Sequence, residues 1–115
     1  MLRLVGVGVG VEEFQWSEDE QVWPFERGVN GETLYCKEVN FGALPNNGTK
    51  TVAHGISNFK TFDAIVVIEE TAGNQVLVKN ASVTSIDVLV STCRIVTNTN
   101  VSMFNAKFRL IYLKT

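Results

Sequence analysis

Apolar and polar residues alternate along most of this chain with the period of two that is typical of β-strands. The alternation is clearest near the C-terminus, where Ala106, Phe108 and Leu110 share one parity. Turn-forming residues such as Asn30-Gly31 separate such runs. No segment combines a helix cap with a 3.6-residue period. The strands predicted in this way cover residues 34–41, 49–54, 62–68, 75–79, 84–92, 94–97 and 105–113.

Strands at these spacings predict an all-β fold, a small antiparallel β-sandwich or jelly-roll-like domain of six to seven strands with an extended N-terminal arm. Residues 62–68 differ from the other runs because they are apolar at both parities. A strand with two apolar faces either lies at the centre of a sheet or is covered by a partner chain. We expect three parts of the chain: an arm (1–15), a lead-in (16–30) and a β-sandwich domain (31–115).

Valine and glycine alternate strictly near the N-terminus, over residues 5–11. On a strand this gives one valine face and one face of bare backbone. Glycine weakens a strand unless another backbone comes close to it. Contact with a neighbouring subunit would explain the glycines, and a flexible arm is the alternative. The arm residues predicted to contact another subunit or protein are Val5, Val7 and Val9.

The next segment combines acidic charge with large aromatic side chains. Residues 12–30 carry six acids and one arginine, a net charge of −5, and four of the chain's eleven aromatic residues lie among them. This combination predicts a segment that docks onto another molecule. The alternative is an irregular connection whose aromatics cap the protein's own core. The aromatic residues concerned are Phe14, Trp16, Trp23 and Phe25.

Length and composition limit the classes of function. The 115 residues suffice for one domain, and a content of 45% apolar and 19% charged residues is typical of a globular protein. The net charge of −2 provides no basic field for nucleic acid. The apolar runs are too short to span a bilayer. We therefore expect neither nucleic acid nor a membrane as a partner.

Few residues are suited to catalysis or metal binding. The two cysteines, Cys36 and Cys93, and the single histidine, His54, fall short of the roughly four ligands of a zinc site. The cysteines are expected to be buried thiols, with a disulfide as the open alternative. His54 is expected in a turn, with its ring hydrogen-bonded to backbone. The glycines at residues 6–10 lack the strand and helix of a dinucleotide loop. We predict no catalytic residue, no metal, no cofactor and no enzyme activity.

Two polar loops, at residues 45–49 and 97–100, are rich in asparagine and threonine. Their amide and hydroxyl groups can donate and accept the hydrogen bonds that sugars offer. A carbohydrate- or receptor-binding module is therefore one candidate function. The candidate recognition residues are Asn46, Asn47, Asn98 and Asn100.

Residues 34–50 read Leu-Tyr-Cys-Lys-Glu-Val-Asn-Phe-Gly-Ala-Leu-Pro-Asn-Asn-Gly-Thr-Lys, and residues 52–58 read Val-Ala-His-Gly-Ile-Ser-Asn. These stretches resemble a small domain that recurs in tail-fibre and other minor structural proteins of tailed bacteriophages and prophages. Residues 17–22 resemble the lead-in of that domain, and residues 108–115 resemble its last strand. The resemblance thus covers about residues 16–115.

One turn departs from the family pattern. The family usually has a Trp shortly before an Asp-Gly-Lys turn, whereas here the turn is Asn30-Gly31-Glu32 and Trp23 lies further upstream. The family also usually stands at the C-terminal end of longer chains, so residues 1–15 would have to supply any attachment.

The resemblance implies a β-sandwich component of the virion, commonly a homotrimer at a fibre tip. It places this chain on the tail or head of a particle as a short fibre, tip or decoration protein. The partners it implies are further copies of this chain, other virion proteins held through the N-terminal segment, and a glycan or protein of the host cell surface.

Overall fold

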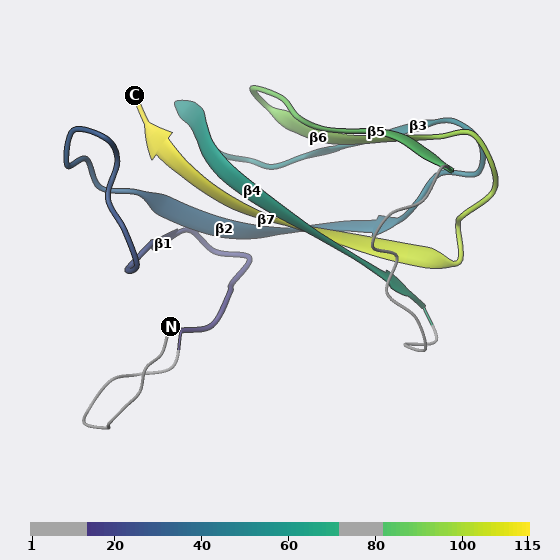
Figure 1. Cartoon of the computed structure of the whole chain (residues 1–115), viewed down its shortest axis with the longest axis horizontal. Helices are drawn as coiled ribbons and strands as arrows, with labels where there is room; N and C mark the ends of the chain where they lie inside the picture. Colours follow the sequence, from purple (N-terminus) through teal and green to yellow (C-terminus); the bar gives the residue numbers. More distant parts are fainter. Residues whose placement is uncertain (1–13, 72–81) are drawn as a thin grey trace.

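In a computed structural model that describes residues 14–71 and 82–115, these residues form seven antiparallel strands in two sheets (Figure 1). The two ranges contain no helix, so the predicted all-β class is confirmed. The larger sheet has the order β1 (Gln21–Val22), β2 (Tyr35–Ala43), β7 (Phe104–Lys114) and β4 (Phe59–Glu70). The smaller sheet has the order β3 (Thr49–Ala53), β6 (Thr92–Thr97) and β5 (Val83–Val88).

The main core lies between the two sheets and follows from the alternation of the sequence. Phe108 and Leu110 of β7 are fully buried, and they belong to the same apolar cluster as Cys93 and Ile95 of β6. Burying such side chains removes apolar surface from water, which is the main favourable contribution to folding. One face of β2 also packs into this cluster, through Tyr35, Val39 and Phe41.

β4 is an edge strand among the described residues, so the first of the two alternatives for this strand, a place at the centre of a sheet, is wrong there, and cover by a partner chain stays a prediction. It pairs with β7 alone in that part of the chain. Its inner row still enters the core, since Ile68 is buried and Val66 packs against the cluster. On the opposite face Ile65 is 46% exposed. Because β4 is apolar on both faces, one apolar row packs into the core and the other faces solvent.

One predicted boundary needs correction, and one strand was missed. The strand predicted over 84–92 ends at Val88, because the Leu89 N–H donates to the Thr92 carbonyl and the chain turns there. The short strand β1 was not predicted, since a pair of residues gives no periodic signal. The predicted strand 75–79 and the candidate contacts Val5, Val7 and Val9 lie outside the described residues.

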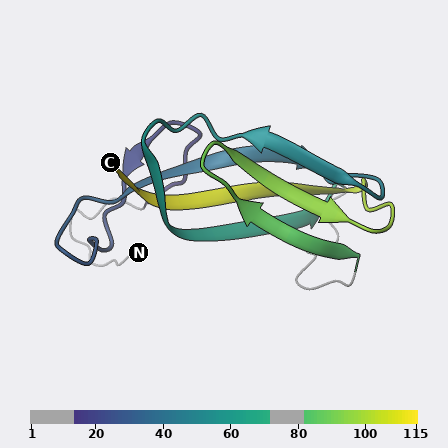
Figure 2. The same cartoon turned by 90° about the horizontal axis from the view of Figure 1, so that it is seen from above.

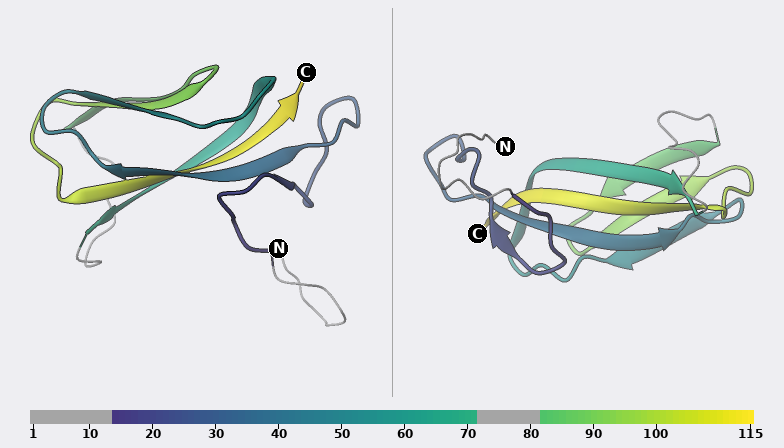
Figure 3. Two further views of the ribbon diagram at one scale, coloured as in Figure 1. Left: turned by 180° about the vertical axis from the view of Figure 1, so that it is seen from behind. Right: turned by 90° about the horizontal axis from the view of Figure 1, so that it is seen from below.

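The functional candidates lie at two opposite ends of the molecule. Figures 1 and 2 show the lead-in, the β1–β2 connection and the C-terminus at one end. The β2–β3 and β6–β7 connections, which hold the two polar loops, lie at the other end. Figure 3 shows the lead-in on the outer face of the larger sheet, the face turned away from the smaller sheet.

Candidate functional site

The four aromatic residues of the lead-in region form one cluster, which we call the aromatic cluster (Phe14, Trp16, Trp23 and Phe25). Phe14 lies at its centre, with ring centroids 5.3–5.5 Å from the other three in edge-on geometry. Trp23 and Phe25 are also in contact, at 4.8 Å. Edge-to-face pairs at these distances stabilise one another beyond the area they bury.

This cluster covers the outer face of the larger sheet. Phe14, Trp16 and Trp23 pack there against a second apolar cluster of Leu34, Cys36 and Ile111. The interpretation in which the aromatics cap the protein's own core therefore holds for these three side chains. Contact of the aromatic cluster with another molecule remains a prediction. Apolar side chains that stay exposed in β1 and in the β1–β2 connection are Val22 (58%), Phe25 of the cluster itself (41%) and Val29 (94%).

Polar contacts hold the lead-in on the sheet. The backbone N–H of Glu38 donates to the Ser17 carbonyl at 2.8 Å, which extends the pairing of β2. Arg109 of β7 lies 5.6 Å from the centre of the Trp16 ring and forms an ion pair of 3.1 Å with Glu38. A guanidinium over an indole face gains cation–π attraction.

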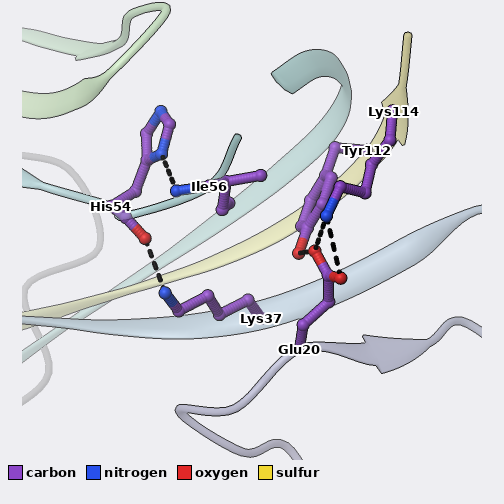
Figure 4. A network of polar contacts seen from close by, with 6 residues as sticks. All are labelled: Glu20, Lys37, His54, Ile56, Tyr112 and Lys114. Atoms are coloured by element: carbon purple, nitrogen blue, oxygen red, sulfur yellow. Dashed lines mark hydrogen bonds and ion pairs between the residues drawn. The ribbon is translucent and has the colours of Figure 1, made fainter. Parts of the chain in front are cut away.

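Glu20 links the lead-in to the last strand (Figure 4). Its carboxylate accepts a hydrogen bond of 2.7 Å from the Tyr112 hydroxyl and bonds of 3.1 Å from Lys114 Nζ. Burial alone would raise the pKa of Glu20, but the bonds from Tyr112 and Lys114 together lower it below its ordinary value. Burial and the Glu20 carboxylate raise the pKa of Tyr112, so this hydroxyl stays protonated as a donor.

At the far end the structure brings the two predicted recognition loops together. Asn46 and Asn100 form an isolated β-bridge, and the Asn47 N–H donates to the Thr99 carbonyl at 3.0 Å. The four asparagines that were candidates from the sequence, Asn46, Asn47, Asn98 and Asn100, are all exposed. We call them the asparagine surface.

Thr97 joins the two loops from below. It is 4% exposed, its N–H donates to the Gly48 carbonyl at 2.8 Å, and its hydroxyl donates to the Pro45 carbonyl at 3.1 Å. A buried hydroxyl needs such a partner, because leaving it unpaired costs about 1–3 kcal/mol. The sequence offered no signal for this contact, since Thr97 resembles any other threonine of the loop.

Local backbone chemistry shapes the asparagine surface. Asn47 has a φ of 52°, a conformation that asparagine adopts more readily than most residues. The Asn100 carbonyl Oδ1 accepts hydrogen bonds from the Ser102 N–H and hydroxyl, at 3.1 and 2.7 Å. The two loops are paired with each other, and these contacts fix the backbone of Asn47 and the side chain of Asn100. Exposed amides at such fixed positions can donate and accept hydrogen bonds with an outside molecule.

His54 has a structural role, as predicted. Its side chain is 1% exposed, and Nδ1 accepts a hydrogen bond from the Ile56 N–H at 3.2 Å (Figure 4). The other ring nitrogen, Nε2, lies 3.0 Å from the Leu89 carbonyl. A carbonyl can only accept, so these partners define a ring protonated at Nε2 and bare at Nδ1. Lys37 donates to the His54 carbonyl at 2.7 Å. Both nitrogens of the ring are thus engaged by backbone.

The two cysteines are free buried thiols in different sheets, Cys36 in β2 of the larger sheet and Cys93 in β6 of the smaller sheet. Cys36 belongs to the cluster under the aromatic lead-in, whereas Cys93 belongs to the core between the sheets. Burial raises the pKa of each thiol to about 11. The disulfide that the sequence left open does not form in this fold.

Among residues 14–71 and 82–115, no three His, Cys, Asp or Glu side chains lie close enough to hold a metal ion together. The same part of the chain contains no helix of the length and apolar character needed to cross a membrane.

Fold and surfaces together define a two-sheet all-β protein whose lead-in packs on its own sheet and whose far end carries asparagines. Comparisons with known protein families, with curated proteins and with solved structures found no match to this chain.

Proposed function

We propose that this chain is a non-catalytic structural component of a bacteriophage virion, a short fibre, tip or decoration protein on the tail or head. In this proposal it acts as a homotrimer. The N-terminal arm and the lead-in attach it to the particle, and the far end of the sandwich is displayed.

One observation carries the proposal, the placement of the two candidate surfaces at opposite ends of the molecule (Figure 1). At one end, Val22, Phe25 and Val29 keep apolar surface exposed in β1 and the β1–β2 connection. Apolar and aromatic surface of this kind is typical of protein contacts. At the other end, the asparagine surface is polar and is held by backbone pairing. A protein that attaches at one end and displays the other needs two ends with different surfaces of this kind.

The resemblance of residues 34–58 to a domain of phage fibre proteins supports the same proposal. The distinctive parts of that resemblance are the Leu-Pro-Asn-Asn-Gly loop at residues 44–48 and the His-Gly-Ile run at residues 54–56. In the structure the loop forms one half of the asparagine surface, next to Thr99 and Asn100.

A carbohydrate- or receptor-binding module is the second candidate, and the asparagine surface favours it. Four exposed asparagines drawn from two loops offer amide groups to sugar hydroxyls. The two candidates overlap, because a displayed fibre tip can also contact a glycan or protein of the host surface.

Particle association tests the first candidate. We expect the tagged chain to sediment with purified phage particles, and the fraction bound to fall at least tenfold when residues 1–15 are deleted. Unchanged incorporation of the deleted chain would show that the arm is not the attachment.

A glycan array tests the second candidate. Binding to a defined glycan that the double variant Asn47→Ala/Asn100→Ala loses, while Val29→Ala retains it, would support recognition through the asparagine surface. Absence of binding at high protein concentration would exclude a carbohydrate ligand of the kinds displayed.

A further inference from the structure

The two long sides of the sandwich are closed differently. On the side of β2 and β3, Lys37 Nζ donates to the His54 carbonyl at 2.7 Å and Lys50 Nζ donates to the Ala43 carbonyl at 2.8 Å. β4 and β5 lie together on the other side (Figure 2). No hydrogen bond between residues of the described ranges joins β4 to β5 there. Within the described residues, one side is therefore tied by lysines, and on the other side no such bond joins the two sheets.

Core-facing positions are exposed on the side of β4 and β5. Ala64 lies opposite Leu110 in the register of β4 and β7, and Ile86 lies opposite Ile95 in the register of β5 and β6. Residues directly opposite in antiparallel strands point to the same face. Leu110 and Ile95 are fully buried, yet Ala64 is exposed and Ile86 is 41% exposed.

Further apolar residues continue this strip of open core. Phe62 on β4 is 36% exposed, and Leu89, which follows β5, is 38% exposed. We call Phe62, Ala64, Ile86 and Leu89 the open side of the sandwich.

The outer edge of β4 adds unpaired backbone to this surface within the described residues. A bulge at Phe62 and a hydrogen bond of 2.8 Å from the Ala64 N–H to Asp63 Oδ1 close the beginning of that edge. The seven residues 64–70 then continue without a bulge, and four of them, residues 65–68, are β-branched. A regular edge of such residues favours pairing with another strand.

We propose that the open side receives the N-terminal arm of a second copy of this chain, which adds to β4 as a strand. The inference rests on the proposed function, whose subunit contact it specifies. In this inference Val5, Val7, Val9 and Val11 cover the exposed part of a neighbour's core.

The sequence of the arm fits this surface in period and length. Its valines recur at every second position over residues 5–11, and the inward row of β4 recurs in the same way at Ala64, Val66 and Ile68. An added strand would place its valines beside that row and over Ile86. The alternating stretch has seven residues, the same length as the regular edge of β4. Its glycine face would point outward, where a bare backbone lets another chain come close.

The position of Phe14 favours a neighbour's β4 over the chain's own. Phe14 packs with Trp16 and Trp23 against a cluster that draws on the start of β2 and on Ile111 of β7. A strand added to β4 would lie about 10 Å from β7 and about 14 Å from β2. Val11 is three residues from Phe14, a reach of about 10 Å, so the chain's own arm would meet its own β4 only when fully extended across the sheet. A neighbour's arm is under no such limit.

Crosslinking between differently tagged chains tests the contact. Val7→Cys in one chain and Ala64→Cys in the other, refolded together and treated with a short bismaleimide, should give a crosslinked pair carrying both tags. The matched control is Gly8→Cys, whose side chain would point to the opposite face, and its yield should be at least tenfold lower. The native thiols are buried with the pKa of each at about 11, so they should not react.

Two outcomes of this experiment would overturn the inference. Equal yields from Val7→Cys and Gly8→Cys would indicate a flexible arm. The absence of any pair with both tags would show that the arm does not enter a neighbour.

The mass of the full chain in solution tests the proposed subunit contact independently. The variant Val7→Asp/Val9→Asp should lower the native mass from that of the oligomer to that of a monomer and keep the β-sheet circular dichroism. An unchanged mass would contradict the inference. A chain that is present in particles but gives no crosslink there would overturn the strand contact and leave the virion role standing.

Discussion

Glu20 is the residue whose charge state most directly couples the lead-in to the sandwich. Its carboxylate lies between the Tyr112 hydroxyl and the Lys114 ammonium, and these partners lower its pKa in the folded protein. A carboxyl with a lowered folded-state pKa stabilises the fold above its ordinary pKa, here 4.5, and this stabilisation is lost as the pH falls through the folded-state value.

We therefore expect Glu20→Gln to lower the free energy of unfolding at pH 7 by about 1 kcal/mol, a modest value because the carboxylate is partly exposed. The difference between the variant and the natural chain should shrink as the pH falls below 4.5 and through the lowered folded-state pKa of Glu20. Urea unfolding at a series of pH values measures both curves. Curves that stay parallel down to the lowest pH would show that Glu20 makes no such contribution.

Cys36 and Cys93 should be unreactive in the folded protein. Both are fully buried, and the pKa of each is raised to about 11, so the thiolate that attacks a disulfide reagent is scarce at pH 8. We expect Ellman's reagent to modify neither thiol on a time scale on which it modifies both in urea. Rapid reaction of either thiol in the native protein would contradict the described burial.

At the scale of elements, the lead-in stabilises the sandwich by covering its outer face. Trp16→Ala should lower the free energy of unfolding by about 2 kcal/mol, because a half-buried indole and its contact with Arg109 are lost. It should also make Cys36 reactive and leave Cys93 protected in the core between the sheets. Val29→Ala, at a position that is 94% exposed, serves as the control and should change neither quantity. Equal reactivity of the two thiols would contradict the assigned cover.

The contact between the two asparagine-containing loops depends on the hydrogen bonds of Thr97. Thr97→Val keeps the shape of the side chain but leaves the Pro45 carbonyl without its donor, so we expect a loss of about 1–3 kcal/mol in thermal or urea unfolding. Thr97→Ser keeps the hydroxyl and should lose less. If the two variants are equally stable, the hydroxyl bond does not hold the loops together.

The strands of the core could be predicted from the sequence because alternation and burial agree there. The inward rows of β2 and β7 follow the period of two, and Phe108 and Leu110 are fully buried as expected. The edge position of β4 could not be predicted, since two apolar faces are also typical of a central strand. The packing of Trp16 and Trp23 stayed open, because aromatics beside charges suit either a partner or the protein's own sheet. The joining of Asn46 to Asn100 depends on pairing across 54 positions, which a local pattern does not contain.

At the scale of the whole molecule, the account describes a short two-ended protein. The exposed apolar surface of β1 and the β1–β2 connection lies at one end, the asparagine surface lies at the other, and the open side of the sandwich lies between them. The proposed display role depends on further copies of this chain and on other particle proteins.

Purified particles give the most direct test of the proposed virion role. The measurement is mass spectrometry of peptides from this chain across a density gradient, on particles released by the strain that encodes it. The account predicts that the peptides band with the particles at a constant ratio to the other structural proteins. Peptides confined to the particle-free fractions would contradict it.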